Sequence, residues 1–308
     1  MKKNLFQLSL FFLLSVFVSN AQKTVYVLSD PHVMSPDLLV NAGSAWENHL
    51  SSQRKLLDYS ADLFESAIDE IKSAKPDLVL ICGDLTKDGE VESHNFVKGK
   101  LDELKLMGIS TYVIPGNHDR GAQSNALRFD GDTSTPVATL SNSEFKSYYT
   151  DYGYSSERQD PNSLSYACEA LPGLWLIRID SGVNGVVSES TIDWVCQQAA
   201  YGRNLGLKPV AMMHHALVPH VTNANMFIST FVVNQNGSGE QSYESMKNRF
   251  IEAGIRVIYT GHLFIDGDGG SGGGAVAKVR NDYNEEEIEE QEFFCGMLEE
   301  ENSSTSLW

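Results

Sequence analysis

The sequence has few basic residues for its length. Its 308 residues include 23 Lys and Arg against 41 Asp and Glu, which gives a net charge of −18. This shortage argues against nucleic acid as a stable partner, because binding to a phosphate backbone requires a basic surface. The acidity is uneven, since residues 265–308 hold 12 acidic and 2 basic residues. The remainder is mildly acidic and is compatible with a small anionic substrate beside bound cations.

Cysteine is also scarce. The four cysteines are Cys82, Cys168, Cys196 and Cys295, and they form no CxxC pair and no regular spacing. This pattern excludes a disulfide-dense scaffold. Cys82 lies in an apolar run and is expected to be a buried free thiol. A bridge between Cys168 and Cys196 is left open by the sequence.

Long hydrophobic runs are missing except at the N-terminus. Leu5 to Val18 is mostly apolar, follows the basic pair Lys2-Lys3, and precedes the small residues of Ser19-Asn20-Ala21. These features are typical of a secretory signal peptide over residues 1–21, cleaved after Ala21. The alternative is a membrane anchor, for which the run is short. We therefore expect a periplasmic or secreted protein without a transmembrane span in the mature chain.

The remaining chain alternates apolar β-branched runs with helical patterns. A β-α-β-α-β order predicts a parallel sheet covered by helices, and continuous apolar runs favour strands that are buried on both faces. Polar residues 120–165 are expected to form an insertion over the site, with a short helix near 142–149. The expected strands are 25–28, 78–81, 111–114, 174–179, 209–213 and 256–259, and the expected helices are 53–74, 90–107, 188–200 and 239–253.

Residue types that bind metals follow the predicted strands at one end. They are Asp30-Pro31-His32, Gly83-Asp84, Gly116-Asn117-His118-Asp119, His214-His215 and Gly261-His262. Each piece alone is weak, because a Gly-Asp pair is a common turn and a lone histidine is more often structural. The carboxyl ends of parallel strands meet at one sheet edge, however, and carboxylate, imidazole and amide groups gathered there predict a two-metal hydrolytic site.

Spacing suggests how some of these side chains act. Asp30 and His32 are two residues apart in an extended segment, so both can bind one cation. Asp84 follows a glycine at a close turn and is placed to bridge two metals. His118 is suited to proton donation, and Asp119 is expected to orient it or to stabilise its charge. Of the adjacent histidines 214 and 215, only one is expected to face the site.

This ordered series resembles the motifs of the calcineurin-like metallophosphoesterase superfamily, which are D-x-H, G-D, G-N-H-[DE], H and G-H-x-H. The resemblance spans Thr24 to His262. The run from Gly83 to Glu90, GDLTKDGE, is similar to the secreted bacterial branch that includes class III cyclic-nucleotide phosphodiesterases. The resemblance implies a four-layer αββα sandwich within residues 22–264 and a dinuclear metal centre with a bridging hydroxide.

The resemblance also implies roles for the matching positions. The first metal would be bound by Asp30 and His32, and Asp84 would bridge the pair. The second metal would be bound by Asn117, His214 and His262. His118 would be the general acid or a phosphate contact, with Asp119 behind it. The mixed nitrogen and oxygen ligands favour Mn, Fe or Zn over Ca or Mg.

The last motif departs from this pattern. It has Phe264 where the superfamily has a second histidine, a ligand of the first metal. Phenylalanine cannot ligate, so the first metal site is expected to be weaker or filled differently. Residues 265–308 are rich in glycine and acid, which predicts a flexible tail and an incomplete second sheet. Two explanations of this change in composition are compatible with the sequence: a divergent natural C-terminus, or a truncated or frame-shifted reading frame.

Two classes of function therefore compete. The favoured hypothesis is a metal-dependent phosphodiesterase that acts on a small phosphate ester, with nucleotides among the candidate substrates and a phosphomonoesterase as an alternative. The other hypothesis is a catalytically impaired secreted binding protein, which Phe264 motivates. A nuclease is disfavoured because there is no basic stripe.

Overall fold

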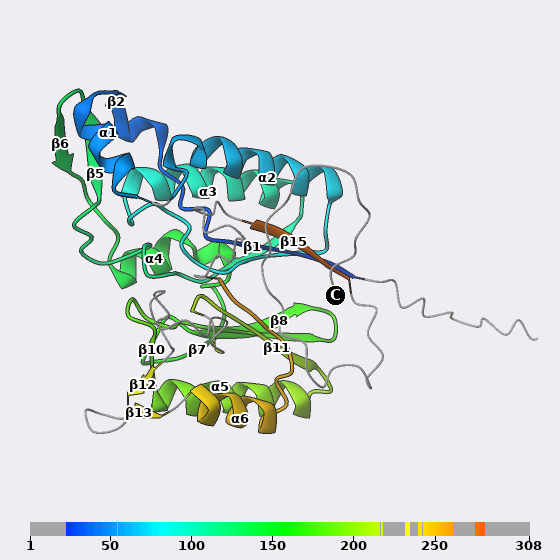
Figure 1. Ribbon diagram of the computed structural model, residues 1–308. Helices are drawn as coiled ribbons and strands as arrows, with labels where there is room; N and C mark the ends of the chain where they lie inside the picture. Colours follow the sequence, from blue (N-terminus) through cyan, green and yellow to red (C-terminus); the bar gives the residue numbers. More distant parts are fainter. Residues whose placement is uncertain are drawn as a thin grey trace, which may run out of the picture.

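The computed structural model describes residues 23–53, 55–215, 217, 232–234, 240–241, 243–261 and 275–280. Within these residues two larger β-sheets lie face to face, and each carries two helices on its outer side (Figure 1). This is the four-layer αββα arrangement that the family resemblance implied. No helix in these ranges is long and apolar enough to cross a membrane. The predicted signal peptide lies outside the described residues and stays a prediction.

The first sheet has the strand order β15-β1-β3-β4. Strands β1 (Thr24–Ser29), β3 (Leu78–Ile81) and β4 (Ser110–Val113) are parallel, as the β-α-β-α-β pattern predicted. Helices α2 (Ser60–Ala74) and α3 (Val91–Leu106) connect them and cover the outer face. All four residues of β3 are buried, which explains its unbroken apolar sequence.

Helix α2 begins later than the periodicity suggested. Residues 55 and 56 lie in a loop before the 3-10 turn η2 (Leu57–Tyr59), and the helix starts at Ser60. Phe64, Ile68 and Ile71 bury one face of α2. Leu56 and Leu63, which the pattern assigned to the packed side, are 45% and 47% exposed. The apolar pattern therefore includes residues that line a surface near the metal-ligand motifs.

The second sheet has the order β14-β11-β9-β8-β7. Strands β9, β11 and β14 are parallel, and β8 is antiparallel to β9. Helices α5 (Glu189–Asn204) and α6 (Tyr243–Glu252) cover its outer face. The strand bounds are β7 (Arg158–Gln159), β8 (Tyr166–Leu171), β9 (Leu174–Ile179), β11 (Lys208–Met213) and β14 (Ile258–Tyr259).

One strand falls in the range that was interpreted as a tail. Strand β15 (Ala275–Arg280) pairs antiparallel with β1 at the edge of the first sheet. Its sequence, AVAKVR, contains two valines, which favour a strand. The prediction of a tail gave more weight to the glycine and acid content of residues 265–308 than to these valines. In the described part of the chain the second sheet ends at β14. The boundary between domain and tail at residue 264 stays a prediction.

Smaller elements surround this core. The expected short helix in the insertion is α4 (Asn142–Tyr148), which Ser141 and Glu144 cap reciprocally. The insertion also contains an unpredicted hairpin, which forms a sheet with β2. Cys168 and Cys196, whose pairing the sequence left open, are both free thiols. The remaining elements are η1 (Pro36–Leu38), β2 (Leu39–Asn41), α1 (Ser44–Ser51), β5 (Leu127–Asp130), β6 (Thr133–Pro136), η3 (Thr150–Tyr152), β10 (Val186–Ser188), β12 (Val232–Asn234) and β13 (Glu240–Gln241).

Candidate metal centre

The metal-ligand motifs meet where the strands of both sheets end. The loop after β1 continues to pair with the loop after β3, because Asp30 N donates to Gly83 O at 3.1 Å and His32 N donates to Asp84 O at 2.9 Å. A Cβ atom on Gly83 would lie only 2.7 Å from His214 Nδ1, a residue that follows β11 of the second sheet. Glycine at this position therefore permits the two sheets to approach each other at the site.

Three buried side chains form the first group of candidate ligands. The ligand atoms of Asp30, His32 and Asp84 lie within 4.8 Å of one another. His32 Nε2 is 3.5 Å from Asp84 Oδ2 and 3.9 Å from Asp30 Oδ1. Two buried carboxylates and one imidazole at this separation match the donor types that a divalent transition metal prefers.

The backbone at these three residues is strained. Asp30, His32 and Asp84 have φ values of 53°, 43° and 49°, in the left-handed region that non-glycine residues seldom adopt. Each such residue costs about 1–3 kcal/mol, and such strain is concentrated at functional sites. All three candidate ligands of one group share this conformation, which indicates that the fold is constrained to aim these side chains at one point.

A second group lies on the other side of Asp84. His214 Nε2 is 3.3 Å from Asp84 Oδ2 and 3.0 Å from Asn117 Oδ1. His214 Nδ1 lies 2.9 Å from the carbonyl oxygen of Cys82, so Nδ1 can donate there and leave Nε2 for a ligand. The Asp84 Oδ2 atom is thus close to an imidazole from each group, which is the position that a bridging carboxylate requires.

Burial and charge set the protonation of these groups without metal. Burial lowers the pKa of His32 well below its ordinary value, which keeps the imidazole neutral, as metal binding requires. Burial would also lower the pKa of His214, but Asp84 and Asp30 outweigh it and raise that pKa to about 9. Burial would raise the pKa of Asp84, and His214 and His32 instead lower it well below its usual range.

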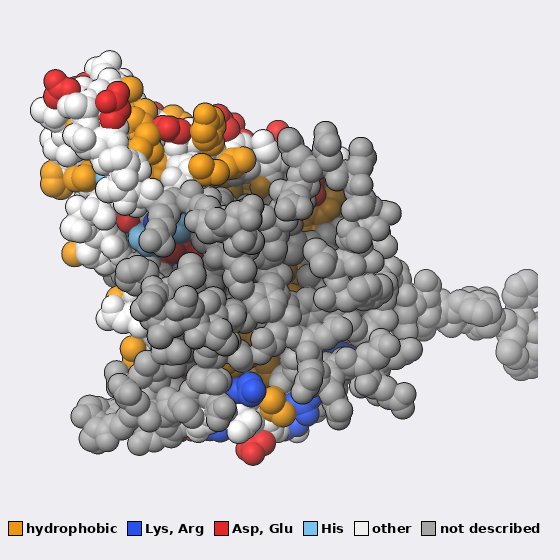
Figure 2. Space-filling view, viewed as in Figure 1, with side chains coloured by type: hydrophobic (Ala, Val, Ile, Leu, Met, Phe, Trp, Pro, Cys, Tyr) orange, Lys and Arg blue, Asp and Glu red, His pale blue; other side chains and the backbone are white. Residues whose placement is uncertain are grey.

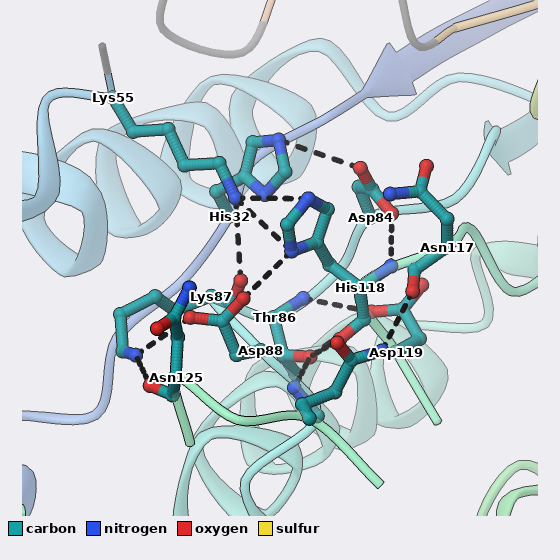
Figure 3. A network of polar contacts seen from close by, with 12 residues as sticks. His32, Lys55, Asp84, Thr86, Lys87, Asp88, Asn117, His118, Asp119 and Asn125 are labelled. Carbon is teal, nitrogen blue, oxygen red and sulfur yellow. Dashed lines mark hydrogen bonds and ion pairs between the residues drawn. The ribbon is translucent and has the colours of Figure 1, made fainter. Parts of the chain in front are cut away.

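The imidazole of His118 lies beside the first group. Its ring makes an edge contact with the His32 ring at a centroid distance of 5.0 Å, and its side chain is 28% exposed. His118 Nδ1 is 2.7 Å from Asp88 Oδ1, and Lys87 Nζ donates to the other Asp88 oxygen at 2.8 Å (Figure 3). The His118 backbone N–H donates to Asp84 Oδ1 at 2.8 Å, which ties the imidazole to the candidate bridging residue.

The contact expected between Asp119 and the His118 imidazole is made by Asp88 instead. The Asp119 carboxylate accepts hydrogen bonds from Gly116 N at 2.7 Å and from Thr86 N at 2.9 Å. Residues 117 and 118 form a turn, so the side chain of Asp119 folds back onto the loop amides and not toward the ring. Asp88 belongs to the GDLTKDGE run. Its carboxylate is the feature of the sequence that could have indicated a partner for His118.

A lysine that the sequence reasoning did not include also lies here. Lys55 Nζ is 3.2 Å from His118 Nδ1, 3.3 Å from His118 Nε2 and 3.3 Å from the carbonyl oxygen of Lys87 (Figure 3). It comes from the loop before η2, which was predicted to be helix. Its proximity to His118 depends on tertiary packing, and no local sequence pattern signals it.

The remaining predicted residues are accounted for as follows. His215 is directed at Ser181, with Nδ1 2.7 Å from Ser181 Oγ, so His214 is the neighbour that faces the site. His262 and Phe264 lie outside the described residues. Gly261, which precedes His262, donates from its N–H to His214 O at 2.8 Å. A Cβ atom on Gly261 would lie 2.4 Å from Asp30 Oδ2, so the end of β14 reaches the first group of ligands.

A family profile matches most of the chain. The profile described as calcineurin-like phosphoesterase matches residues 23–264. The sequence is 27% identical over 162 residues to a protein of Arcobacter nitrofigilis named probable glycerophosphodiester phosphodiesterase GpdQ. That alignment covers 49% of this chain and 49% of the relative, so the match spans about half the length of the relative. A crystal structure of a dimetal phosphatase from Danio rerio is 15% identical, with a TM-score of 0.37 over 79% of this chain and 70% of that chain.

Proposed function

The chain belongs to the calcineurin-like phosphoesterase family, and from this premise we propose that it hydrolyses phosphate diesters with two divalent metal ions. The observation that carries the proposal is the position of Asp84 Oδ2, 3.5 Å from His32 Nε2 and 3.3 Å from His214 Nε2. One carboxylate shared by two sets of donors is what a two-metal hydrolase requires.

The donor set fits such ions. Asp30 and Asp84 are each 2% exposed, and burial of two neighbouring carboxylates is unfavourable unless cations compensate their charge. Asp30, His32 and Asp84 would hold the first ion. Asp84, Asn117 and His214 would hold the second, with His262 as the family pattern implies. The combination of imidazole, carboxylate and amide donors favours Mn, Fe or Zn.

The bound cations would neutralise charge on the phosphoryl oxygens and lower the pKa of the attacking water. His118 supplies the proton for the leaving alkoxide from Nε2, because its Nδ1 faces Asp88 at 2.7 Å. Asp88 orients the ring through its contact with Nδ1. The hydrogen bond from His118 N to Asp84 Oδ1 fixes this acid beside the metal ligands.

The diester preference is supported by the name of the Arcobacter relative, probable glycerophosphodiester phosphodiesterase. The direct test is an assay of Mn²⁺-loaded protein with bis-p-nitrophenyl phosphate, p-nitrophenyl phosphate and cyclic nucleotides. We expect turnover of the diesters, and loss of that turnover in Asp84→Asn. Faster turnover of the monoester would replace the diesterase proposal by a phosphomonoesterase. No turnover, with fewer than two Mn²⁺ per chain, would favour the impaired binding protein.

We also propose that the mature protein is periplasmic or secreted, on the basis of residues 1–21. N-terminal sequencing of the protein recovered from fractionated cells tests this. A new N-terminus at Gln22 in the periplasm or medium is expected. Recovery of the protein in the cytoplasm with Met1 retained would contradict the proposal.

A further inference from the structure

Lys55 brings a positive charge to the substrate side of the proposed active site. Its ammonium lies 3.3 Å from His118 Nε2, the atom that carries the proton in the proposed reaction, and 3.3 Å from the Lys87 carbonyl. In Figure 2, histidine, acidic and basic side chains are visible together on one part of the surface. The side chain of Lys55 is therefore close enough to contact whatever ester His118 protonates.

The charge of Lys55 is not neutralised by a direct ion pair. Within the described ranges, no carboxylate oxygen lies within 4.0 Å of its ammonium, whereas Lys87 pairs with Asp88 at 2.8 Å and with Glu90 at 2.8 Å. Burial lowers the pKa of Lys55, although nearby carboxylates, Asp88 first among them, oppose this effect. A partly buried ammonium without a paired anion is a suitable contact for an anionic ligand.

Lys55 also stands where the metal-ligand loop borders a pocket. The pocket includes Asp30 and His32 in its wall beside Lys55. The rest of the wall is mainly apolar: Leu28, Pro31, Leu56, Leu57, Ser60, Leu63, Phe64 and Ala67. A ligand that binds beside Asp30, His32 and Lys55 can therefore place its organic part against this apolar wall.

We propose that Lys55 is a substrate-binding residue whose ammonium donates a hydrogen bond to a phosphoryl oxygen of the ester, with the organic part of the ester against the adjoining apolar side chains. This inference rests on the proposed phosphoesterase function. An ammonium beside His118 would bind the phosphoryl group while the apolar wall selects its substituent. Arginine at this position should retain part of the effect, because it keeps the charge but changes the geometry.

A different role for Lys55 would be to balance the charge of Asp30 and Asp84 when metals are absent. That role predicts that loss of the ammonium changes Mn²⁺ affinity and leaves anion binding intact. Substrate binding predicts the reverse. Titration of Mn²⁺ into the metal-free protein and of inorganic phosphate into the Mn²⁺-loaded protein separates the two, because each titration reports one of the two ligands.

The test compares wild type with Lys55→Met, Lys55→Arg and the control Lys105→Met by calorimetric titration with inorganic phosphate. Lys105 is a surface lysine, with a side chain that is 55% exposed. We expect Lys55→Met to weaken phosphate binding on the order of tenfold or more, Lys55→Arg to recover part of it, and Lys105→Met to match wild type. Equal phosphate affinity in wild type and Lys55→Met would overturn the inference, as would a wild type that does not bind phosphate.

Ester hydrolysis is measured separately with the same proteins. A rise in KM for bis-p-nitrophenyl phosphate in Lys55→Met, at unchanged melting temperature, supports substrate contact over a structural role. If no ester is hydrolysed but phosphate binding still depends on Lys55, the diesterase proposal fails and the anion contact stands. If esters are hydrolysed with the same KM and phosphate affinity in Lys55→Met, the anion contact fails and the enzyme proposal stands.

Discussion

The Nε2 atom of His214 lies 3.3 Å from the Oδ2 atom of Asp84, although His214 follows a strand of the second sheet and Asp84 follows a strand of the first. The same oxygen is 3.5 Å from His32 Nε2. The contact between the two sheets therefore builds the site, and Asp84 is the residue on which both halves of the proposed metal centre depend.

Asp88→Asn should lower kcat and leave the fold intact. The amide is nearly the same size as the carboxylate but is a weaker hydrogen-bond acceptor for His118 Nδ1, so we expect kcat to fall on the order of 10²-fold. KM should change little, whereas the urea midpoint should fall, because Asp88 also pairs with the buried ammonium of Lys87 at 2.8 Å. A variant with wild-type kcat would show that the 2.7 Å contact between His118 and Asp88 has no part in catalysis.

Asp119→Ala should act mainly on stability. The change removes the acceptor for the Gly116 and Thr86 amides in a fully buried position. Loss of buried hydrogen bonds to a charged group is expected to lower the free energy of unfolding by about 3 kcal/mol or more. Urea denaturation measures this. Full stability together with a collapse of kcat would instead favour the catalytic role that the sequence suggested for Asp119.

The metal-free protein should lose stability as the pH rises through about 9. The folded-state pKa of His214 is raised from its ordinary 6.5 to about 9, so its stabilising effect is complete below pH 6.5 and disappears above pH 9. The shift corresponds to on the order of 3 kcal/mol. Urea denaturation of EDTA-treated protein at pH 6 and pH 10 tests this, with His214→Asn as the control. The same pH dependence in both proteins would exclude His214 as its source.

Ala67→Phe should narrow the apolar pocket beside the site. Ala67 lines that pocket, and a phenyl ring there would cover part of its apolar wall. We expect a KM for bis-p-nitrophenyl phosphate that is higher by about tenfold, with little change for dimethyl phosphate. The matched control is Ala74→Phe, an exposed position at the end of the same helix. An equal change in both variants would argue that the pocket does not hold the ester group.

The sequence predicted the parts of this fold that depend on local pattern. Buried strands such as β3 and the helix α3 follow from apolar periodicity, and the convergence of Asp30, His32 and Asp84 follows from their positions after parallel strands. The predicted start of α2 was wrong because Leu56 fits the helical apolar period but lies before the helix, where it lines a surface pocket. Helical periodicity shows which apolar residues share a face, but it does not show whether that face is buried.

The partners of His118 could not be predicted for a different reason. Asp119 is adjacent in sequence, but the turn directs its carboxylate to Thr86 and Gly116. Asp88, thirty residues away, reaches the ring through packing of the loop after β3. Lys55 reaches it from a third loop. Contacts between loops depend on the tertiary structure, and a motif with fixed spacing gives no information about them.

The shared position of Asp84 is tested most directly by electron paramagnetic resonance of the Mn²⁺-loaded protein. Two ions that share one carboxylate are spin-coupled, so wild type should bind two Mn²⁺ per chain and give a coupled multiline spectrum, and Asp84→Asn should lose it. A wild-type spectrum with only the six lines of isolated Mn²⁺, at two ions per chain or fewer, would contradict a bridged metal centre at Asp84.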